Sequence, residues 1–303
     1  MVNTFDDIHA VDYIEEQRIE LAKLRAAKVG SSVFVPSFIL PIEDSMALTD
    51  SVAAPTAGTP SSYVVTGDKT NQKLFLLLDR DVLDGSDNAH TSTITGVETY
   101  TTGPLIGIGQ IPISFSFDGS SDLTISTEAD FDRERTDTFS ISFWAKWTSV
   151  SAMIFVSKMI ATANTGYEIG ANSSSQIRIR LINTATTNEV DVRTSTAYNT
   201  GVWNHFLFTK GIGSNAAACT LFVNGTSVSL TTTTDNLTAT ILNNIPLVIG
   251  AYDGGTGRLT GYMTDIQWWN TTISSTNALK LADGKQISLT ANPAFSGYCD
   301  VAA

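Results

Sequence analysis

The sequence predicts an all-β sandwich of antiparallel strands, preceded by an N-terminal helix and an extended arm. From about Gly67 onward, short apolar or alternating runs recur between turns rich in glycine, asparagine, aspartate and serine. Only one long stretch, near the N-terminus, has helical spacing. A chain of 303 residues can hold one large all-β domain and an appendage. We therefore divide it into an arm (1–66), a sandwich (67–285) and a C-terminal tail or strand (286–303).

The N-terminal helix is predicted over Asp6–Lys28. Acidic residues crowd its first half and basic residues its second half, an order that complements the helix dipole. Prolines and apolar runs follow in Ser31–Thr66, which favours an extended segment lying on a surface. We expect this arm to grip other copies of the chain or other proteins, the alternative being that the helix packs on its own β-domain. The predicted arm contacts are Ile8, Val11, Ile14, Ile19, Leu21, Phe34 and Phe38.

Nine segments of the sandwich read as strands. They are Lys73–Leu78, Ile113–Phe117, Phe139–Trp147, Ile154–Lys158, Gln176–Ile182, Trp203–Lys210, Thr220–Asn224, Ile245–Ala251 and Gly261–Trp269. Asn224-Gly225 predicts a primed hairpin turn, and Ser275–Asp283 predicts one or two helical turns ending at Gly284.

The last of these strands carries a testable face assignment. Strict alternation places Tyr262, Thr264, Ile266 and Trp268 on one face and Met263, Asp265, Gln267 and Trp269 on the other. The two adjacent tryptophans should then point to opposite faces, one into the core and one outward.

Charge and composition exclude several classes of function. The net charge is −12 and the basic residues are scattered, which argues against nucleic acid or an anionic membrane as a partner. No run reaches the length of a membrane span, and we expect no signal peptide at the N-terminus. The two cysteines, Cys219 and Cys299, are too few for a disulfide framework or a cysteine-rich zinc site.

Six segments, in order, resemble one family. They are LFLLLDRDVLDGSDN (74–88), SFSFDGSSDLTIS (114–126), FSISFWAKWTS (139–149), WNHFLFTKG (203–211), LFVNGTSV (221–228) and IGAYDGGTGRLTGYMTDIQWWNTTIS (249–274). These segments resemble the laminin G-like, concanavalin A-like jelly-roll family, which implies an antiparallel jelly-roll sandwich. Such domains recur behind short helical arms in structural proteins of tailed phages. The resemblance therefore implies a non-enzymatic virion protein (head decoration, tail or fibre component), made in the host cytoplasm and assembled with other virion proteins.

Aromatic and acidic residues suggest a runner-up function, a lectin-like carbohydrate-binding module. Carbohydrate sites need aromatic faces beside polar groups, and the last strands and their glycine-rich turn supply both. The candidate contacts with a cell-surface glycan or a partner are Tyr252, Asp253, Trp268 and Trp269.

Calcium is the one metal that the sequence suggests, and no other cofactor is predicted. The resemblance implies a possible site at the rim of the sandwich, and carboxylate oxygens suit this hard cation. The candidate ligands are Asp79, Asp81, Asp84 and Asp118, but their spacing fails the EF-hand pattern. Acidic turn residues that simply cap loops are the alternative.

A third reading is a glycoside hydrolase. Acids alternate at Glu128, Asp130, Asp132 and Glu134, and an alternating strand can hold two carboxyls on one face. The stretch falls between two predicted strands, however, where the family has a polar loop with one buried aromatic, matching Phe131. We therefore predict a solvated loop and no catalytic residues.

Overall fold

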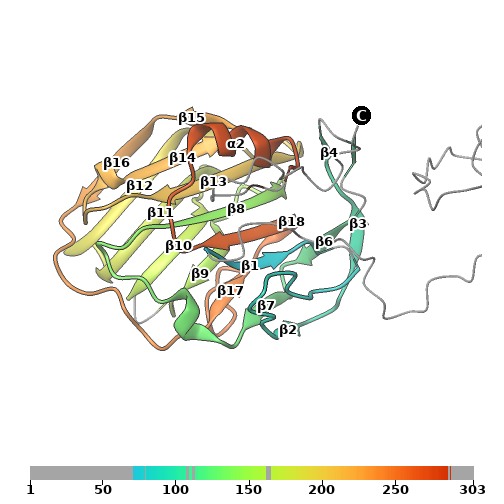
Figure 1. Ribbon diagram of the computed structural model, residues 1–303, viewed down its shortest axis with the longest axis horizontal. Helices are drawn as coiled ribbons and strands as arrows, with labels where there is room; N and C mark the ends of the chain where they lie inside the picture. The colour runs from blue at the N-terminus through green and yellow to red at the C-terminus, as the bar shows by residue number, and fades with distance from the viewer. Residues whose placement is uncertain are drawn as a thin grey trace, which may run out of the picture. The chain divides into compact units, whose positions relative to one another are not determined.

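The described residues form two antiparallel β-sheets that pack face to face around a common core (Figure 1). The structure is a computed structural model, and it describes residues 71–78, 80–106, 109–110, 113–161, 165–285 and 287. Outside these ranges lie the predicted arm of residues 1–66 with all its proposed contact residues, the candidate ligand Asp79, and the tail from residue 286 onward apart from Ile287. The prediction of an all-β sandwich is confirmed.

The first sheet has the strand order β15-β14-β13-β8-β18-β6-β3, and β1 also pairs with β18. Its strands are β1 (Gln72–Leu76), β3 (Tyr100–Thr102), β6 (Ile113–Asp118), β8 (Phe139–Lys146), β13 (Asn204–Lys210), β14 (Cys219–Val223), β15 (Thr226–Val228) and β18 (Thr260–Trp269).

The second sheet has the order β16-β12-β11-β10-β9-β17-β7-β2. Its strands are β2 (Ser92–Thr95), β7 (Asp122–Ile125), β9 (Met153–Lys158), β10 (Gly166–Ala171), β11 (Gln176–Thr184), β12 (Asn188–Ala197), β16 (Leu230–Asp235) and β17 (Leu247–Ile249). A small hairpin of β4 (Leu105–Ile106) and β5 (Gly109–Gln110) and two 3₁₀ turns, η1 (Glu128–Phe131) and η2 (Ala216–Ala218), complete the described strands and turns.

The core lies between the two sheets because each strand alternates its side chains across the sheet plane. In β11, Ile177 and Ile179 are buried in the core while Arg178 and Arg180 face outward. In β13, Phe206 and Phe208 enter the same core. We call the side of the first sheet that faces away from this core its outer face.

A β-bulge in β18 corrects the predicted face assignment of that strand. Thr264 lies opposite Trp144 of β8, but Gln267 lies opposite Ser142, so β18 has one residue more than its partner between these pairs. Asp265 takes up the extra residue with a left-handed φ of 52°. The parity of the strand therefore changes: Met263, Ile266 and Trp268 all belong to the core, and Tyr262 does not share their face.

The outer face of the first sheet is covered at one end by the helix α2 (Ser275–Ala282), which lies over β13 and β15 (Figure 1). The Ser274 side chain caps this helix by accepting from the backbone N–H of Asn277, and Gly284 follows its end with a φ of 74°. The helix predicted at this position is confirmed. Together with strand residues it buries a second apolar cluster of Leu207, Phe222, Trp269, Ile273, Ala278, Leu281 and Ile287.

The predicted hairpin turn joins β14 to β15. Asn224 and Gly225 both have positive φ, 50° and 77°, as a primed turn requires. A Cβ atom at Gly225 would lie 2.9 Å from the Cα of Leu279, so glycine also lets α2 approach the turn closely.

Two further expectations concern membranes and cysteines. In the part of the chain that the structure describes, no helix has the length and apolar content needed to cross a bilayer. Cys219 is a buried free thiol, and burial raises its pKa to about 12.

Candidate functional site

A groove opens on the outer face of the first sheet, beside the end of α2. Its open volume is about 660 Å³, and its lining includes Leu105, Trp144, Lys146, Trp203, Asn224 and Asp283. These residues come from the β4 hairpin, the end of β8, the segment before β13, the β14–β15 turn and the end of α2. The groove therefore forms only when the sheet assembles, because no single segment of the chain contains it.

Strand pairing explains why the rings of Trp203 and Tyr262 both lie beside the Lys146 ammonium. Lys146 ends β8 and lies opposite Tyr262 of β18 on one side. On the other side, β13 pairs with β8 so that His205 lies opposite Trp144, which brings the preceding Trp203 toward Lys146. The Lys146 Nζ lies 5.2 Å from the Trp203 ring centroid and 4.7 Å from that of Tyr262. The two rings are 6.4 Å apart, and the ammonium therefore has a cation–π contact with each.

The Lys146 ammonium gives the groove a positive charge without an ion-pair partner among the described residues. Among the described residues, no carboxylate lies within ion-pair distance of the Lys146 ammonium. The acid at the rim, Asp283, is already 3.6 Å from the ammonium of Lys285. Lys146, Trp203 and Tyr262 are all partly exposed, so solvent or a ligand can reach them.

Trp144 lines the groove and packs on the buried His205 behind it. Trp144 is 6% exposed and its ring lies 5.4 Å from that of His205. His205 is fully buried, and its Nε2 lies 2.7 Å from the hydroxyl of Ser142. Burial lowers the pKa of His205 to about 3, so this ring is neutral at physiological pH. His205 therefore packs against Trp144 as a neutral, buried ring.

The two tryptophans predicted as ligand contacts are both fully buried. Trp268 lies in the core between the sheets, where the Phe139 ring stacks at 5.9 Å. Trp269 does face outward, but α2 and Ile273 cover it. One ring therefore points into the core and the other outward, as predicted, but neither is accessible as a ligand contact, because alternation gives the face of a strand and does not show what packs on it.

Tyr252 and Asp253 lie away from the groove, beside the second sheet. The Tyr252 hydroxyl contacts the carboxylate of Glu168 on β10 and lies 3.4 Å from the Arg180 guanidinium on β11. Burial and the neighbouring Glu168 carboxylate raise the pKa of Tyr252. Both residues remain partly exposed, but the tyrosine hydroxyl is already engaged.

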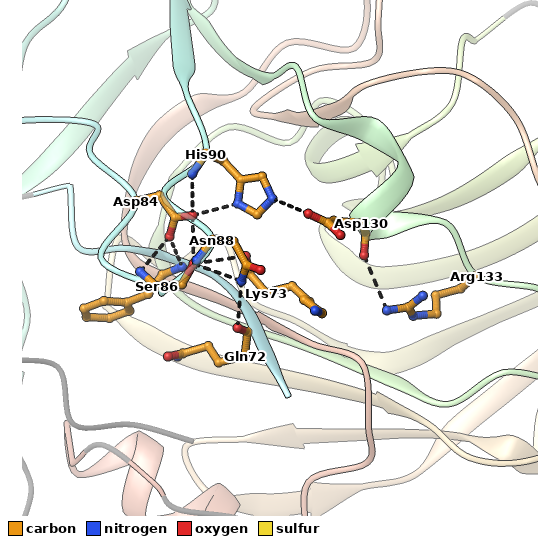
Figure 2. A network of polar contacts seen from close by, with 9 residues as sticks. Gln72, Lys73, Asp84, Ser86, Asn88, His90, Asp130 and Arg133 are labelled. Atoms are coloured by element: carbon orange, nitrogen blue, oxygen red, sulfur yellow. Dashed lines mark hydrogen bonds and ion pairs between the residues drawn. The ribbon is translucent and has the colours of Figure 1, made fainter. Parts of the chain in front are cut away.

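The acidic turn predicted to bind calcium is closed by its own hydrogen bonds (Figure 2). The Asp84 carboxylate accepts from the backbone N–H groups of Phe75, Ser86 and His90, each at 2.9 Å. It also accepts from the Ser86 hydroxyl at 2.8 Å and lies 2.7 Å from the His90 Nδ1. The Asp84 side chain is fully buried, so its oxygens are occupied by the protein itself.

His90 extends this network to a second segment. Its Nε2 lies 3.0 Å from the Asp130 carboxylate in η1 (Figure 2). Its ring lies 5.0 Å from that of Phe131. Burial opposes a charged ring here, but the hydrogen bonds to Asp84 and Asp130 outweigh it and raise the pKa of His90. Burial acts to raise the pKa of Asp84, but the hydrogen bonds from the His90 side chain and from the backbone N–H groups of Phe75, His90 and Ser86 hold it below its ordinary value.

The predicted calcium ligands do not come together. Asp84 bridges to Leu76, which pairs with Ile266, whereas Asp118 pairs with Thr260 at the start of the same strand β18. Six residues of strand separate these positions by about 20 Å, too far for one cation.

Each described acid of the set has a local partner instead. Asp118 accepts from the backbone N–H and hydroxyl of Ser120, at 2.8 Å each, and these bonds lower its pKa to about 2. Asp81 accepts from the backbone N–H of Leu83. Across the described residues, no group of three or more histidine, cysteine, aspartate or glutamate side chains is placed to hold a metal ion. The acids act as loop caps, the alternative weighed above.

The alternating acids at 128–134 also have structural partners. Residues Glu128–Phe131 form η1, so the strand that a carboxylate pair requires is absent there. The Lys158 ammonium lies 2.9 Å from Glu128 and 2.6 Å from Asp132. Phe131 is fully buried, as predicted for this loop.

Sequence reasoning missed Trp144, Lys146 and Trp203, which line the groove, and Tyr262, whose ring contacts the Lys146 ammonium. Trp144 and Lys146 are separated by one residue near the end of a strand, and Trp203 directly precedes the next strand of the sheet. Aromatic and basic residues clustered at strand ends were therefore the available signal. It becomes specific only when the order of strands in the sheet is known.

Solved structures with a similar fold include binding domains. The binding domain of Paraclostridial Mosquitocidal Protein 1 matches with a TM-score of 0.55 and 15% identity, over 71% of this chain and 52% of that one. The receptor binding domain of the botulinum neurotoxin C/D mosaic serotype matches with a TM-score of 0.54 and 13% identity, over 71% and 52%. A structure from botulinum neurotoxin type C matches with a TM-score of 0.53 and 14% identity, over 71% and 51%. This chain thus spans about half the length of each.

At these identities the similarity shows the fold alone. No curated protein is significantly similar in sequence. The family model of laminin G type within the concanavalin A-like lectin/glucanases superfamily matches residues 117–278, more than half of the chain. The matched range includes most strands of both sheets and most of the groove. The chain therefore belongs to the concanavalin A-like lectin/glucanase superfamily.

Proposed function

We propose that the sandwich is a non-enzymatic binding module and that its groove takes a glycan. The observation that carries this proposal is the arrangement of Trp203, Lys146 and Tyr262 on the open part of the outer face. Two partly exposed rings flank an ammonium there, and Lys146 and Trp203 line a depression large enough for a small oligosaccharide.

The chemistry of the groove suits a sugar. The apolar C–H face of a pyranose packs on an aromatic ring, while its hydroxyls need directional hydrogen-bond partners. The Lys146 ammonium supplies donors beside Trp203. The exposed Asn224 amide donates one N–H to Asn204 at 3.0 Å and keeps its second N–H for a ligand. An open groove of this kind binds without enclosing, which fits recognition better than a reaction that must exclude water.

Two further points support binding rather than catalysis. The acids that would serve a glycoside hydrolase are engaged with Lys158 and His90. The similar structures include binding domains, and the cell entry of botulinum neurotoxin type C depends on interaction with two ganglioside molecules.

A glycan-binding assay with groove variants tests the proposal. We expect the full chain to bind a subset of an oligosaccharide array, and Trp203→Ala to weaken that binding about tenfold or more. Val97→Ala, at an exposed apolar position outside the groove, serves as the matched control and should bind as the unmodified chain does. Binding that survives Trp203→Ala but is lost in Tyr252→Ala would move the site to the second sheet. An array on which nothing binds would refute the proposed function.

For the whole chain we propose the wider role expected from the sequence, a virion structural protein attached through residues 1–66. This role rests on the helix and arm pattern and on the resemblance, because residues 1–66 lie outside the described ones. Light scattering on the full chain and on a chain starting at Gly67 tests the arm. We expect only the full chain to form a defined oligomer, and two monomers would refute self-assembly through the arm.

A further inference from the structure

We infer that the groove selects glycans that carry a carboxylate, with Lys146 as the counter-ion. The inference rests on the proposed function and names the chemical class of ligand for the same site. Its basis is the position of the Lys146 ammonium beside two aromatic rings and without a carboxylate partner among the described residues.

Some cations of the two sheets pair with carboxylates, whereas Lys146, like Lys73, Arg193 and Lys210, has no carboxylate partner among the described residues. Of these four, Lys146 is the one that lines the groove. Lys158 pairs with Glu128 and Asp132 at the rim of the second sheet. On its outer face, guanidinium groups pair with carboxylates in Arg178–Asp191 and Arg180–Glu168, and Arg258 pairs with Asp122. These charges are neutralised inside the protein. In a chain of net charge −12, Lys146 is by contrast an ammonium that presents its N–H donors to the groove.

The aromatic neighbours of Lys146 do not satisfy its hydrogen bonds. A cation–π contact places the charge over the ring face but leaves the N–H donors that point away from the rings without an acceptor. Asp283, the acid that lines the same groove, is paired with Lys285 at 3.6 Å and lies at the rim. An anionic group of a ligand is therefore the complement that this part of the groove lacks.

An acidic sugar matches both parts of the site at once. A pyranose with a carboxylate offers an apolar C–H face for Trp203 and an anion for Lys146 within one residue. An acidic peptide offers the anion without the rigid apolar face. A lysine ammonium is a point charge and, unlike a guanidinium, does not hold a carboxylate through two parallel hydrogen bonds. The contact between the sugar and the Trp203 ring would therefore set the orientation of the ligand.

The test compares neutral and acidic oligosaccharides on the full chain. The probes are an array of neutral glycans together with glycans that carry glucuronic, galacturonic or sialic acid, and the best ligand is then tested again as its carboxyl methyl ester. We expect the best ligands to be acidic, and both esterification and Lys146→Met to weaken binding about tenfold. Lys146→Arg should keep most of the affinity, because it keeps the charge. Added salt should weaken binding of the unmodified chain more than that of Lys146→Met.

Each other outcome has a defined meaning. Best ligands that are neutral, or acidic ligands that bind Lys146→Met unchanged, would overturn the inference while the glycan-binding function stands. Equal binding of sulfated glycans or of a polyglutamate peptide would overturn the choice of a carboxylate sugar. No binding of any glycan would refute the proposed function itself. Thermal unfolding of each variant shows whether a loss of binding comes from misfolding.

Discussion

The Asp84 network and the Trp203 groove both gather polar and aromatic side chains from distant segments of the chain. They differ in how much hydrogen-bonding capacity the protein itself leaves unused. In the network, the buried Asp84 carboxylate receives three backbone N–H groups, a hydroxyl and an imidazole. In the groove, the Lys146 ammonium meets two rings and, among the described residues, no carboxylate. A saturated cluster joins parts of the fold, whereas a cluster with unused hydrogen-bond capacity can bind a ligand.

The difference shows why acidic residues alone did not identify a site. Asp84 lies in an acid-rich turn, and its sequence suggests a cation. The backbone N–H groups that satisfy it come from β1 and from the turn itself, and a sequence pattern does not display them. The Asp84 network therefore stabilises the fold. The Trp203 groove is the better candidate for ligand binding.

The largest loss of stability is expected from removing the Asp84 carboxylate. Asp84→Ala leaves several buried donors without an acceptor, and we expect the free energy of unfolding to fall by about 3–5 kcal/mol. Urea denaturation measures the loss, with Thr91→Ala, at an exposed position next to His90, as the control. A loss below about 1 kcal/mol would contradict the structural role of the network.

A smaller effect is expected from the protonation of His90. Its pKa in the folded protein lies above the ordinary 6.5, so the folded state binds this proton more tightly than the unfolded state. The stabilisation is complete below pH 6.5 and is lost as the pH rises through the raised pKa. The free energy of unfolding should therefore fall by at most about 1.4 kcal/mol per pH unit in that window.

His90→Gln supplies the matched variant for this measurement. The difference in unfolding free energy between the unmodified chain and His90→Gln should shrink as the pH rises from about 5.5 to about 8.5. His205 is neutral in the folded protein, where burial lowers its pKa to about 3, but it regains the ordinary 6.5 on unfolding and so adds a slope of the opposite sign. This contribution is the same in both chains and cancels from the difference. A difference that stays constant over this range would mean that the pKa of His90 is the same in the folded and unfolded protein, and would contradict the role given to its contacts with Asp84 and Asp130.

Much of the scaffold was predictable because its signals are local. Apolar runs with turn residues predicted β8, β13 and β14, and Asn224-Gly225 predicted the hairpin that the structure contains. Strands such as β12 and β16 escaped notice because threonine and charged residues dominate them and only one face of β12 is apolar.

The candidate site was much less predictable, for a geometric reason. One extra residue at Asp265 reverses the faces of β18, so Tyr262 lies on the outer face opposite Lys146 although Trp268 points into the core. Period-2 reasoning assumes that no such residue exists. The meeting of Lys146 with Trp203 depends on the pairing of β8 with β13, two strands far apart in the sequence. Neither the bulge nor the strand pairing can be recognised from a short segment of the sequence.

The smallest effect on stability is expected in the groove. A cation–π contact at a partly exposed site contributes about 0.5–1 kcal/mol, so Lys146→Met should change the free energy of unfolding by no more than that. A double-mutant cycle with Trp203→Ala should give a coupling of about the same size by urea denaturation. A coupling of about 3 kcal/mol would instead be typical of a desolvated structural pair. Lys146 would then be as fully committed to the fold as Asp84, and its charge would not be free to meet a ligand.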